Sequence, residues 1–166
     1  MKKIILFTVF LSFFLTLNAQ KKMYVWPAKV DKYVKTDILS GVSVNIEIND
    51  FRIIAPGSDV KATFQQLSDA IKESITKTYG KEFINPDSEI KVSINVQNYD
   101  VTFYTGVWHA QVKYLVKIND KEEEIEQTNN TFNVGGMPSA KKSLNKCFTG
   151  ANLKLFEIFN DNLRKK

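Results

Sequence analysis

The chain has 166 residues with a net charge of +5, and 43% of them are hydrophobic, which predicts one folded domain of ordinary size. The basic residues are spread along the chain rather than gathered in a stripe, so composition argues against nucleic-acid binding. The single cysteine, Cys147, excludes an internal disulfide. We expect Cys147 to be a buried apolar residue of a helix, with an intermolecular disulfide or a nucleophilic role as the alternatives.

Residues 1–19 have the three parts of a secretory signal peptide. Lys2 and Lys3 precede an apolar run over residues 4–17, and the small residue Ala19 supplies a cleavage site. The run is shorter than the roughly 20 residues that a membrane span needs. We therefore expect cleavage near Ala19, export to the periplasm or beyond the cell, and no transmembrane segment in the mature chain. No cysteine lies near the cut, so lipid attachment is not expected.

The remaining chain divides into an irregular N-terminal segment, residues 20–41, and a single α+β domain, residues 42–166. Trp26 in the first segment is a candidate surface contact. Apolar and polar residues alternate over residues 42–49, which predicts a half-buried strand. After a change of phase, this strand could be continued by Phe51, Ile53 and Ile54.

A helix is predicted next. Residues 56–59 read Pro-Gly-Ser-Asp, which stops the strand and offers an N-cap. One apolar stripe with helical spacing runs from Val60 to Tyr79. Gly80 supplies the C-terminal cap.

The middle of the chain predicts a pair of strands joined by a turn. Residues 90–97 alternate cleanly, and residues 99–103 continue in the opposite phase, which indicates a bulge near Asn98. A turn at Thr105-Gly106 leads to a strand over residues 108–118.

The last part of the chain predicts one more strand and one more helix. Asn119-Asp120-Lys121 is a hairpin break, and the strand that follows, residues 122–134, is polar enough for an edge position. Residues 135–139 stop the sheet and cap a helix with an apolar stripe from Leu144 to Phe159.

The order strand, helix, three strands, helix predicts a two-layer sandwich in which both helices cover one face of an antiparallel sheet. The other face is polar. It is either a solvated face with cross-strand charge pairs or a docking surface completed by the N-terminal segment. The candidate binding residues are Trp26, Asn45, Glu47, Asn95, His109, Gln111 and Lys113.

No pattern of residues predicts a catalytic site, a metal site or a cofactor. His109 is the only histidine and has no carboxylate beside it in sequence, whereas zinc sites and histidine bases need such partners. The glutamate-rich run over residues 122–126 lacks the spaced ligands and the glycine turn of a calcium loop. Residues 135–139 lack the lysine of a phosphate-binding loop.

The strand that ends in Asp50-Phe51-Arg52 resembles the opening of YajG-like periplasmic lipoproteins and related envelope accessory lipoproteins. In those proteins a strand of this kind leads into a long amphipathic helix and then into further strands. The resemblance implies an envelope-associated, non-catalytic accessory role. This chain departs from the family because it lacks the lipidated cysteine. A local reading of Asp50 and Arg52 is a turn with a surface ion pair.

The sequence thus favours an exported, non-catalytic accessory or binding module of the cell envelope, with a protein or envelope component as its partner. One alternative is a small hydrolase with a non-local site around His109, Glu47 and Lys113. Another alternative is a small-ligand carrier with an apolar pocket between the sheet and the helices.

Overall fold

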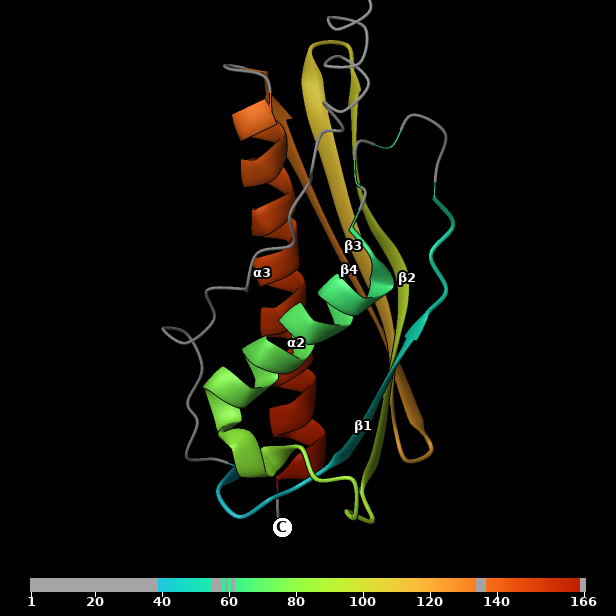
Figure 1. Cartoon of the computed structure of the whole chain (residues 1–166), viewed down its shortest axis with the longest axis vertical. Helices are drawn as coiled ribbons and strands as arrows, with labels where there is room; N and C mark the ends of the chain where they lie inside the picture. The colour runs from blue at the N-terminus through green and yellow to red at the C-terminus, as the bar shows by residue number, and fades with distance from the viewer. Residues whose placement is uncertain (1–38, 55–57, 59, 61, 134–136, 165–166) are drawn as a thin grey trace, which may run out of the picture.

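The structure, a computed structural model, describes residues 39–54, 58, 60, 62–133 and 137–164 (Figure 1). The predicted signal peptide and Trp26 lie outside the described residues. In chain order, the elements are β1 (Asn45–Asp50), α2 (Phe64–Tyr79), the short 3-10 helix η2 (Lys81–Phe83), β2 (Lys91–Tyr104), β3 (Val107–Ile118), β4 (Lys121–Phe132) and α3 (Met137–Leu163). The predicted order did not include η2.

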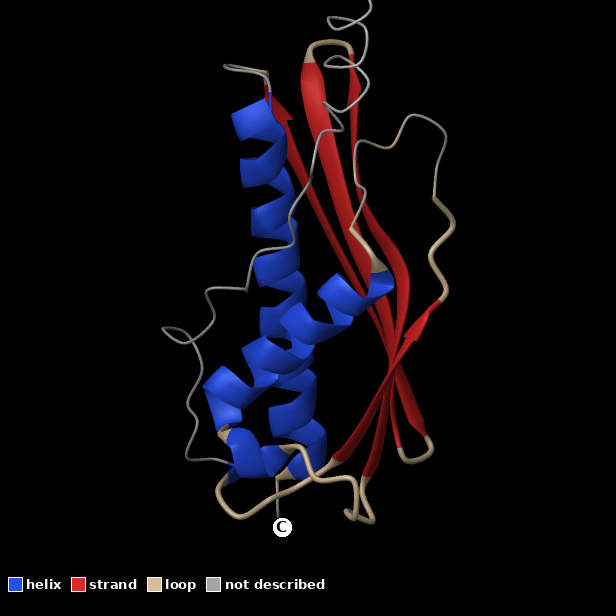
Figure 2. Ribbon diagram, in the orientation of Figure 1, coloured by secondary structure: helices blue, strands red, loops and turns tan. Residues whose placement is uncertain are grey.

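The described strands form one sheet in the order β1-β2-β3-β4. β1 runs parallel to β2, while β2, β3 and β4 pair antiparallel. The predicted α+β class is confirmed, and α2 and α3 lie on the same side of the sheet (Figure 2). The prediction of an antiparallel sheet was wrong for β1, because α2 carries the chain back along the sheet before β2 begins. The sheet is therefore mixed.

The predicted bulge in β2 is confirmed. The pairing of β2 with β3 skips one residue between Val96 and Asn98, which leaves Gln97 as the extra residue. The skip reverses the alternation, so that Val96 before it and Tyr99 after it are both buried. The bulge thus keeps a long strand in contact with the core on both sides of the irregularity.

The start of α2 differs from the prediction. The helix begins at Phe64, with Thr63 as its N-cap, rather than after residues 56–59. The Thr63 hydroxyl accepts from the Gln66 amide at 3.2 Å, and the Gln66 side chain accepts from the Thr63 amide at 3.0 Å. This capping box satisfies two backbone donors, which explains why the helix starts there. The predicted cap at Gly80 is confirmed, because its N–H bonds to the Thr76 carbonyl and its φ is +94°.

α3 packs along the sheet and closes the core. It extends beyond the predicted apolar stripe at both ends, from Met137 to Leu163. Its Phe148 ring meets Tyr99 of β2 edge to face, with centroids 5.6 Å apart. Cys147 is buried as predicted, and burial raises the pKa of its thiol to about 12. The thiol is therefore protonated at neutral pH and packs as a small apolar group.

The hairpin turn between β2 and β3 is strained at one residue. Thr105 has a φ of +50° and Gly106 a φ of +78°. Two-residue turns with positive φ at both positions suit a twisted hairpin and favour Asn-Gly. Thr105 is β-branched, so it adopts this backbone conformation at a conformational penalty.

We expect the substitution Ile94→Asp to unfold the domain. Ile94 is fully buried in β2, and an unpaired carboxylate there costs several kcal/mol, comparable with the whole stability of a domain. A thermal melt by circular dichroism measures the effect. Lys91→Asp, on an exposed position of the same strand, is the control and should change the melt little. A cooperative melt of Ile94→Asp at the wild-type temperature would show that the assigned core face is wrong.

We expect Thr105→Asn to stabilise the protein by about 1 kcal/mol, because asparagine adopts positive φ more readily. Gly106→Ala should destabilise it by about the same amount. A Cβ at Gly106 would meet no atom within 4 Å, so this loss reflects backbone conformation alone. Urea unfolding measures both changes. Shifts of the same sign would contradict the turn geometry.

Candidate functional site

The predicted binding residues other than Trp26 lie on the uncovered face of the sheet, and most of their side chains contact polar groups of neighbouring residues. Gln111 donates to Glu126 at 2.7 Å, and Lys113 pairs with Glu124 at 2.9 Å. Asn95 accepts hydrogen bonds from neighbouring polar side chains at 3.1 Å, and Asn45 donates to a backbone carbonyl at 2.8 Å. The contacts of Gln111 and Lys113 join β3 to β4, as is expected on a solvated sheet face, whereas Asn45 bonds to the Pro86 carbonyl in the loop before β2.

The residues of the hydrolase alternative do not come together. Glu47 pairs with Ser93, which pairs with Lys117, and Lys117 lies eight residues along β3 from His109. Eight strand residues span about 25 Å, too far for His109 and Glu47 to share a substrate atom. His109 instead contacts Asn130 through Nδ1 at 2.9 Å and stacks on Tyr104, with ring centroids 3.7 Å apart.

The described residues contain no group of three or more His, Cys, Asp or Glu side chains that could hold a metal ion. Within the same part of the chain, no helix is long and apolar enough to cross a membrane.

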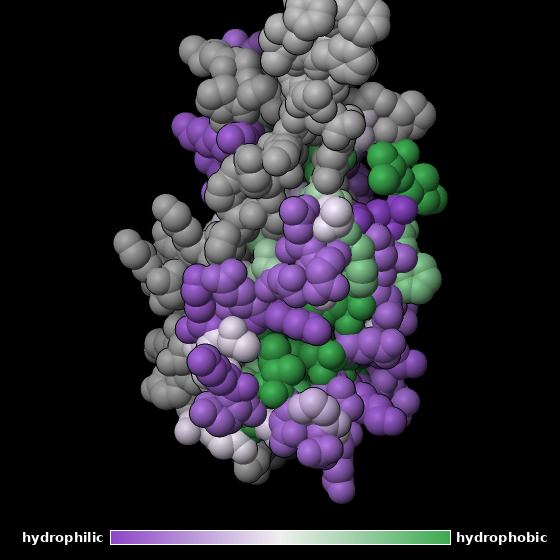
Figure 3. All heavy atoms as spheres, in the orientation of Figure 1, coloured by the Kyte–Doolittle hydropathy of each residue, from purple (hydrophilic) through white to green (hydrophobic). Residues whose placement is uncertain are grey.

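The segment that follows β1 reverses the usual burial of its side chains. Phe51, Ile53 and Ile54 are 63%, 89% and 73% exposed, whereas the Arg52 side chain between them is only 10% exposed. The predicted continuation of the strand through these residues was wrong, because β1 ends at Asp50 and only the Phe51 amide still bonds to β2. Figure 3 shows hydrophobic atoms at the right-hand surface, where Figure 1 shows the chain leaving β1.

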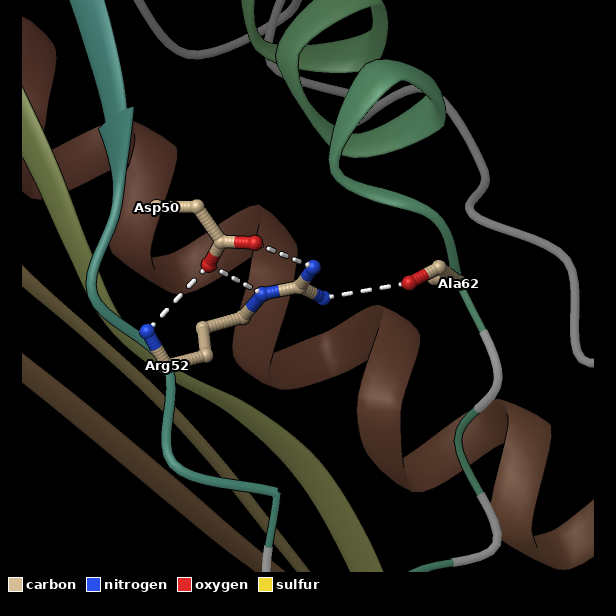
Figure 4. A network of polar contacts seen from close by, with 3 residues as sticks. All are labelled: Asp50, Arg52 and Ala62. Carbon is tan, nitrogen blue, oxygen red and sulfur yellow. Dashed lines mark hydrogen bonds and ion pairs between the residues drawn. The ribbon is translucent and has the colours of Figure 1, made fainter.

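Arg52 holds this segment in place. Its Nε and one terminal nitrogen donate to the two carboxylate oxygens of Asp50 at 2.7 and 2.9 Å. Its other terminal nitrogen donates to the carbonyl oxygen of Ala62 at 3.2 Å (Figure 4). Arg52 thereby joins the end of β1 to the residues just before α2. We name these three residues the arginine clamp. The predicted local ion pair of Asp50 and Arg52 is therefore present; Asp50 lies at the surface, while the Arg52 side chain is mostly buried and also reaches Ala62.

The arginine clamp also stabilises the ionised form of Asp50. The hydrogen bond from the Arg52 side chain holds the pKa of Asp50 below its ordinary value, against a smaller opposing effect of burial. The carboxylate is therefore charged at neutral pH and serves as a structural acceptor. Nearby, the Ser58 hydroxyl bonds to the carboxylate of Asp100, which attaches the returning chain to β2.

A hollow lies on each side of the exposed segment. One, of about 370 Å³, lies between this segment, the chain before α2 and the bulged part of β2; its lining includes Ile53, Ile54, Val60, Asn98 and Tyr99. The other, of about 580 Å³, opens on the uncovered sheet face, and its lining includes Phe51, Ile53, Asn95, Gln97 and Leu115. Asn95 is thus the predicted binding residue that lies at this site.

The sequence analysis missed Phe51, Ile53 and Ile54 as candidates because it treated them as the continuation of a strand. One signal could have identified them. Ile53 and Ile54 are adjacent, and adjacent residues of a strand point to opposite faces, so a half-buried strand could bury only one of them.

The comparisons with known proteins concern the fold. No family model matches the chain, and no curated protein matches it. Among solved structures, the chain is similar to protein XCC0632 from Xanthomonas campestris, described under the DUF330 family, with a TM-score of 0.51 and 10% identity over 72% of this chain and 84% of that one. A structure described as an uncharacterized protein has a TM-score of 0.45 and 10% identity over 70% and 88%.

At 10% identity, the similarity to XCC0632 shows a shared fold alone. DUF330 proteins are uncharacterised bacterial proteins, so this similarity assigns no activity. The resemblance to YajG-like lipoproteins stays a prediction.

We expect Asp50→Asn to lower the stability at neutral pH by about 1 kcal/mol, because the Arg52 cation loses its charged partner. The pKa of Asp50 is lower in the folded than in the unfolded state. Its contribution is therefore complete above the unfolded pKa of about 4 and is lost as the pH falls through the folded pKa. Urea unfolding from neutral pH to about pH 2 should show the variant and the wild type converging in acid.

Asp161→Asn, at an exposed position of α3, is the matched control and should leave stability nearly unchanged across this range. A stability difference between Asp50→Asn and the wild type that stays constant with pH would contradict the role of the carboxylate in the arginine clamp.

Proposed function

We propose that the chain is an exported, non-catalytic binding module of the cell envelope, and that Phe51, Ile53 and Ile54 form its contact surface for a protein partner. The observation that carries this proposal is a set of exposed apolar side chains on a backbone held by Arg52, whose side chain is mostly buried. Export and the envelope setting rest on the predicted signal peptide and on the resemblance to YajG-like lipoproteins.

The energetics favour a protein contact at this segment. Removing a large apolar side chain from water contributes about 1.5 to 3 kcal/mol, and an exposed cluster forgoes this contribution until a partner covers it. The arginine clamp orders the segment before binding, so less entropy is lost on association. The neighbouring hollows can receive side chains of the partner, and Asn95, Gln97 and Asn98 provide a polar rim.

The smaller hollow supports a second candidate function, the binding of a small apolar ligand. Its volume of about 370 Å³ lies in the range of ligand pockets, and Ile53, Ile54 and Val60 contribute to its lining. Native mass spectrometry of the purified chain tests this candidate. A bound small molecule that is lost on Ile54→Asp, with the melt retained because Ile54 is exposed, would favour it.

We expect the triple substitution Phe51→Ser, Ile53→Ser and Ile54→Ser to abolish capture of the partner while leaving the melt unchanged, because these side chains are exposed. The measurement is a quantitative pull-down of the processed chain, from Gln20 onward, in envelope extract, read by mass spectrometry. A stoichiometric protein recovered with the wild type should fall by about tenfold or more with the variant.

The control for the pull-down is Phe103→Ser with Phe132→Ser, which removes apolar surface of a similar kind from another part of the sheet. This control should retain the partner. Retention of the partner by the triple variant, or recovery of nothing specific with the wild type, would contradict the proposed contact surface.

A further inference from the structure

A second group of exposed apolar residues lies at the end of the sheet where β2 turns into β3. Phe103, Tyr104 and Phe132 are 45%, 55% and 75% exposed. Tyr104 pairs with Val107, which pairs with Phe132, so these three form one row across the uncovered face. Phe103 pairs with the buried Trp108 and therefore lies on the other face, at the same end of the sheet. We name Phe103, Tyr104, Val107 and Phe132 the aromatic tip. Figure 1 shows this turn at one extremity of the molecule, away from the start of β1.

The rings of the aromatic tip are ordered by neighbouring side chains. Tyr104 stacks on His109 with an interplanar angle of 10°, and the centroids of Phe103 and Trp108 lie 4.7 Å apart. The indole N–H of Trp108 donates to the Asn133 side chain at 3.1 Å. The exposed rings therefore stand on a supported surface rather than on a free loop.

The two stretches of chain at the aromatic tip carry no carboxylate, and the residue just before the first of them, Asp100, bonds to the Ser58 hydroxyl. No Asp or Glu occurs in residues 101–119 or in residues 127–156. These stretches include the β2–β3 turn, the end of β4 and the first half of α3. Ser143 bonds to the Asn129 backbone at 2.9 Å, which places the start of α3 beside the end of β4.

Exposed lysines lie near the start of α3, in the second of these carboxylate-free stretches. Lys142 and Lys146, in the first turns of α3, are exposed. The acidic residues of β4 lie toward its other end, where Glu124 pairs with Lys113 and Glu123 with Lys121. The fold thus separates an aromatic, cationic end of the domain from an end of mixed charge.

We propose that the aromatic tip docks on an anionic lipid surface. Aromatic side chains favour the interface between lipid and water, and lysines near it attract anionic headgroups. A carboxylate at this end would oppose both effects, and residues 101–119 and 127–156 contain none. The uncharged Thr102 and Asn130 beside the rings can exchange hydrogen bonds with headgroups. This proposal concerns a surface distinct from Phe51, Ile53 and Ile54, and it does not depend on the proposed function.

Flotation with lipid vesicles tests the proposal. The processed chain should float with vesicles of phosphatidylglycerol and phosphatidylethanolamine, and less with vesicles of phosphatidylcholine alone. Tyr104→Ser with Phe132→Ser should lower partitioning by about tenfold or more, because two exposed rings are lost. Lys142→Glu with Lys146→Glu should remove the preference for anionic vesicles, as should high salt.

The matched control is Phe51→Ser with Ile53→Ser, which should float like the wild type. All variants share the same N-terminal segment, so a difference among them is due to the substituted residues. A second measurement leaves the tip intact: with Trp26→Phe, brominated lipids should quench the emission of Trp108, which lies beside Phe103.

Absence of vesicle binding, or equal partitioning of the wild type and the Tyr104 and Phe132 variant, would overturn the proposal. The proposal would also be overturned, in favour of a protein contact, by two results together. The wild type would not bind vesicles, and the Tyr104 and Phe132 variant would lose a protein that the wild type captures from detergent-solubilised extract. If the Phe51, Ile53 and Ile54 variant retained the partner in the pull-down, the proposed contact surface would be contradicted. The vesicle result would be unaffected, so each proposal can be contradicted without the other.

Discussion

The parallel pairing of β1 with β2 is the constraint on which the rest of this structure depends. Parallel neighbours cannot be joined by a tight turn, so the chain must travel back along the sheet through α2. The pairing of β1 with β2 ends at Val96. Beyond Val96, β2 is paired with β3 and no longer with β1. The chain leaving β1 therefore passes beside a strand edge, where the arginine clamp attaches it.

The two faces of the sheet explain why the candidate surfaces are apolar. One face is covered by α2 and α3 and contains the core. On the uncovered face, polar side chains bond to one another, as Gln111 does with Glu126 and Lys113 with Glu124. Such contacts are already satisfied without a partner. The exposed apolar groups gain most from being covered, and they stand on supported backbone at two separate places.

Predicting the core from the sequence required local information, whereas predicting the candidate site required knowledge of contacts between separate segments. The alternation in β2, its bulge and the buried Cys147 were predictable, because each depends on the periodicity of neighbouring residues. The exposure of Phe51, Ile53 and Ile54 could not be predicted in this way. It depends on the hydrogen bond from Arg52 to the carbonyl of Ala62, ten residues later. The sequence pattern also favoured the polar sheet face, rather than the apolar segments, as the candidate binding surface. Polar residues on a strand are easy to identify, whereas an exposed isoleucine has no local signature.

By itself, the sequence determined which stretches form strands and helices, and it determined which side of each element is apolar. These properties are local, because side-chain periodicity sets the buried face of a strand or helix. Only the tertiary structure decided that β1 runs parallel to β2 and that the arginine clamp turns Phe51, Ile53 and Ile54 outward. Each of these depends on which of several competing partners a backbone or charged group meets, and distant parts of the chain supply those partners.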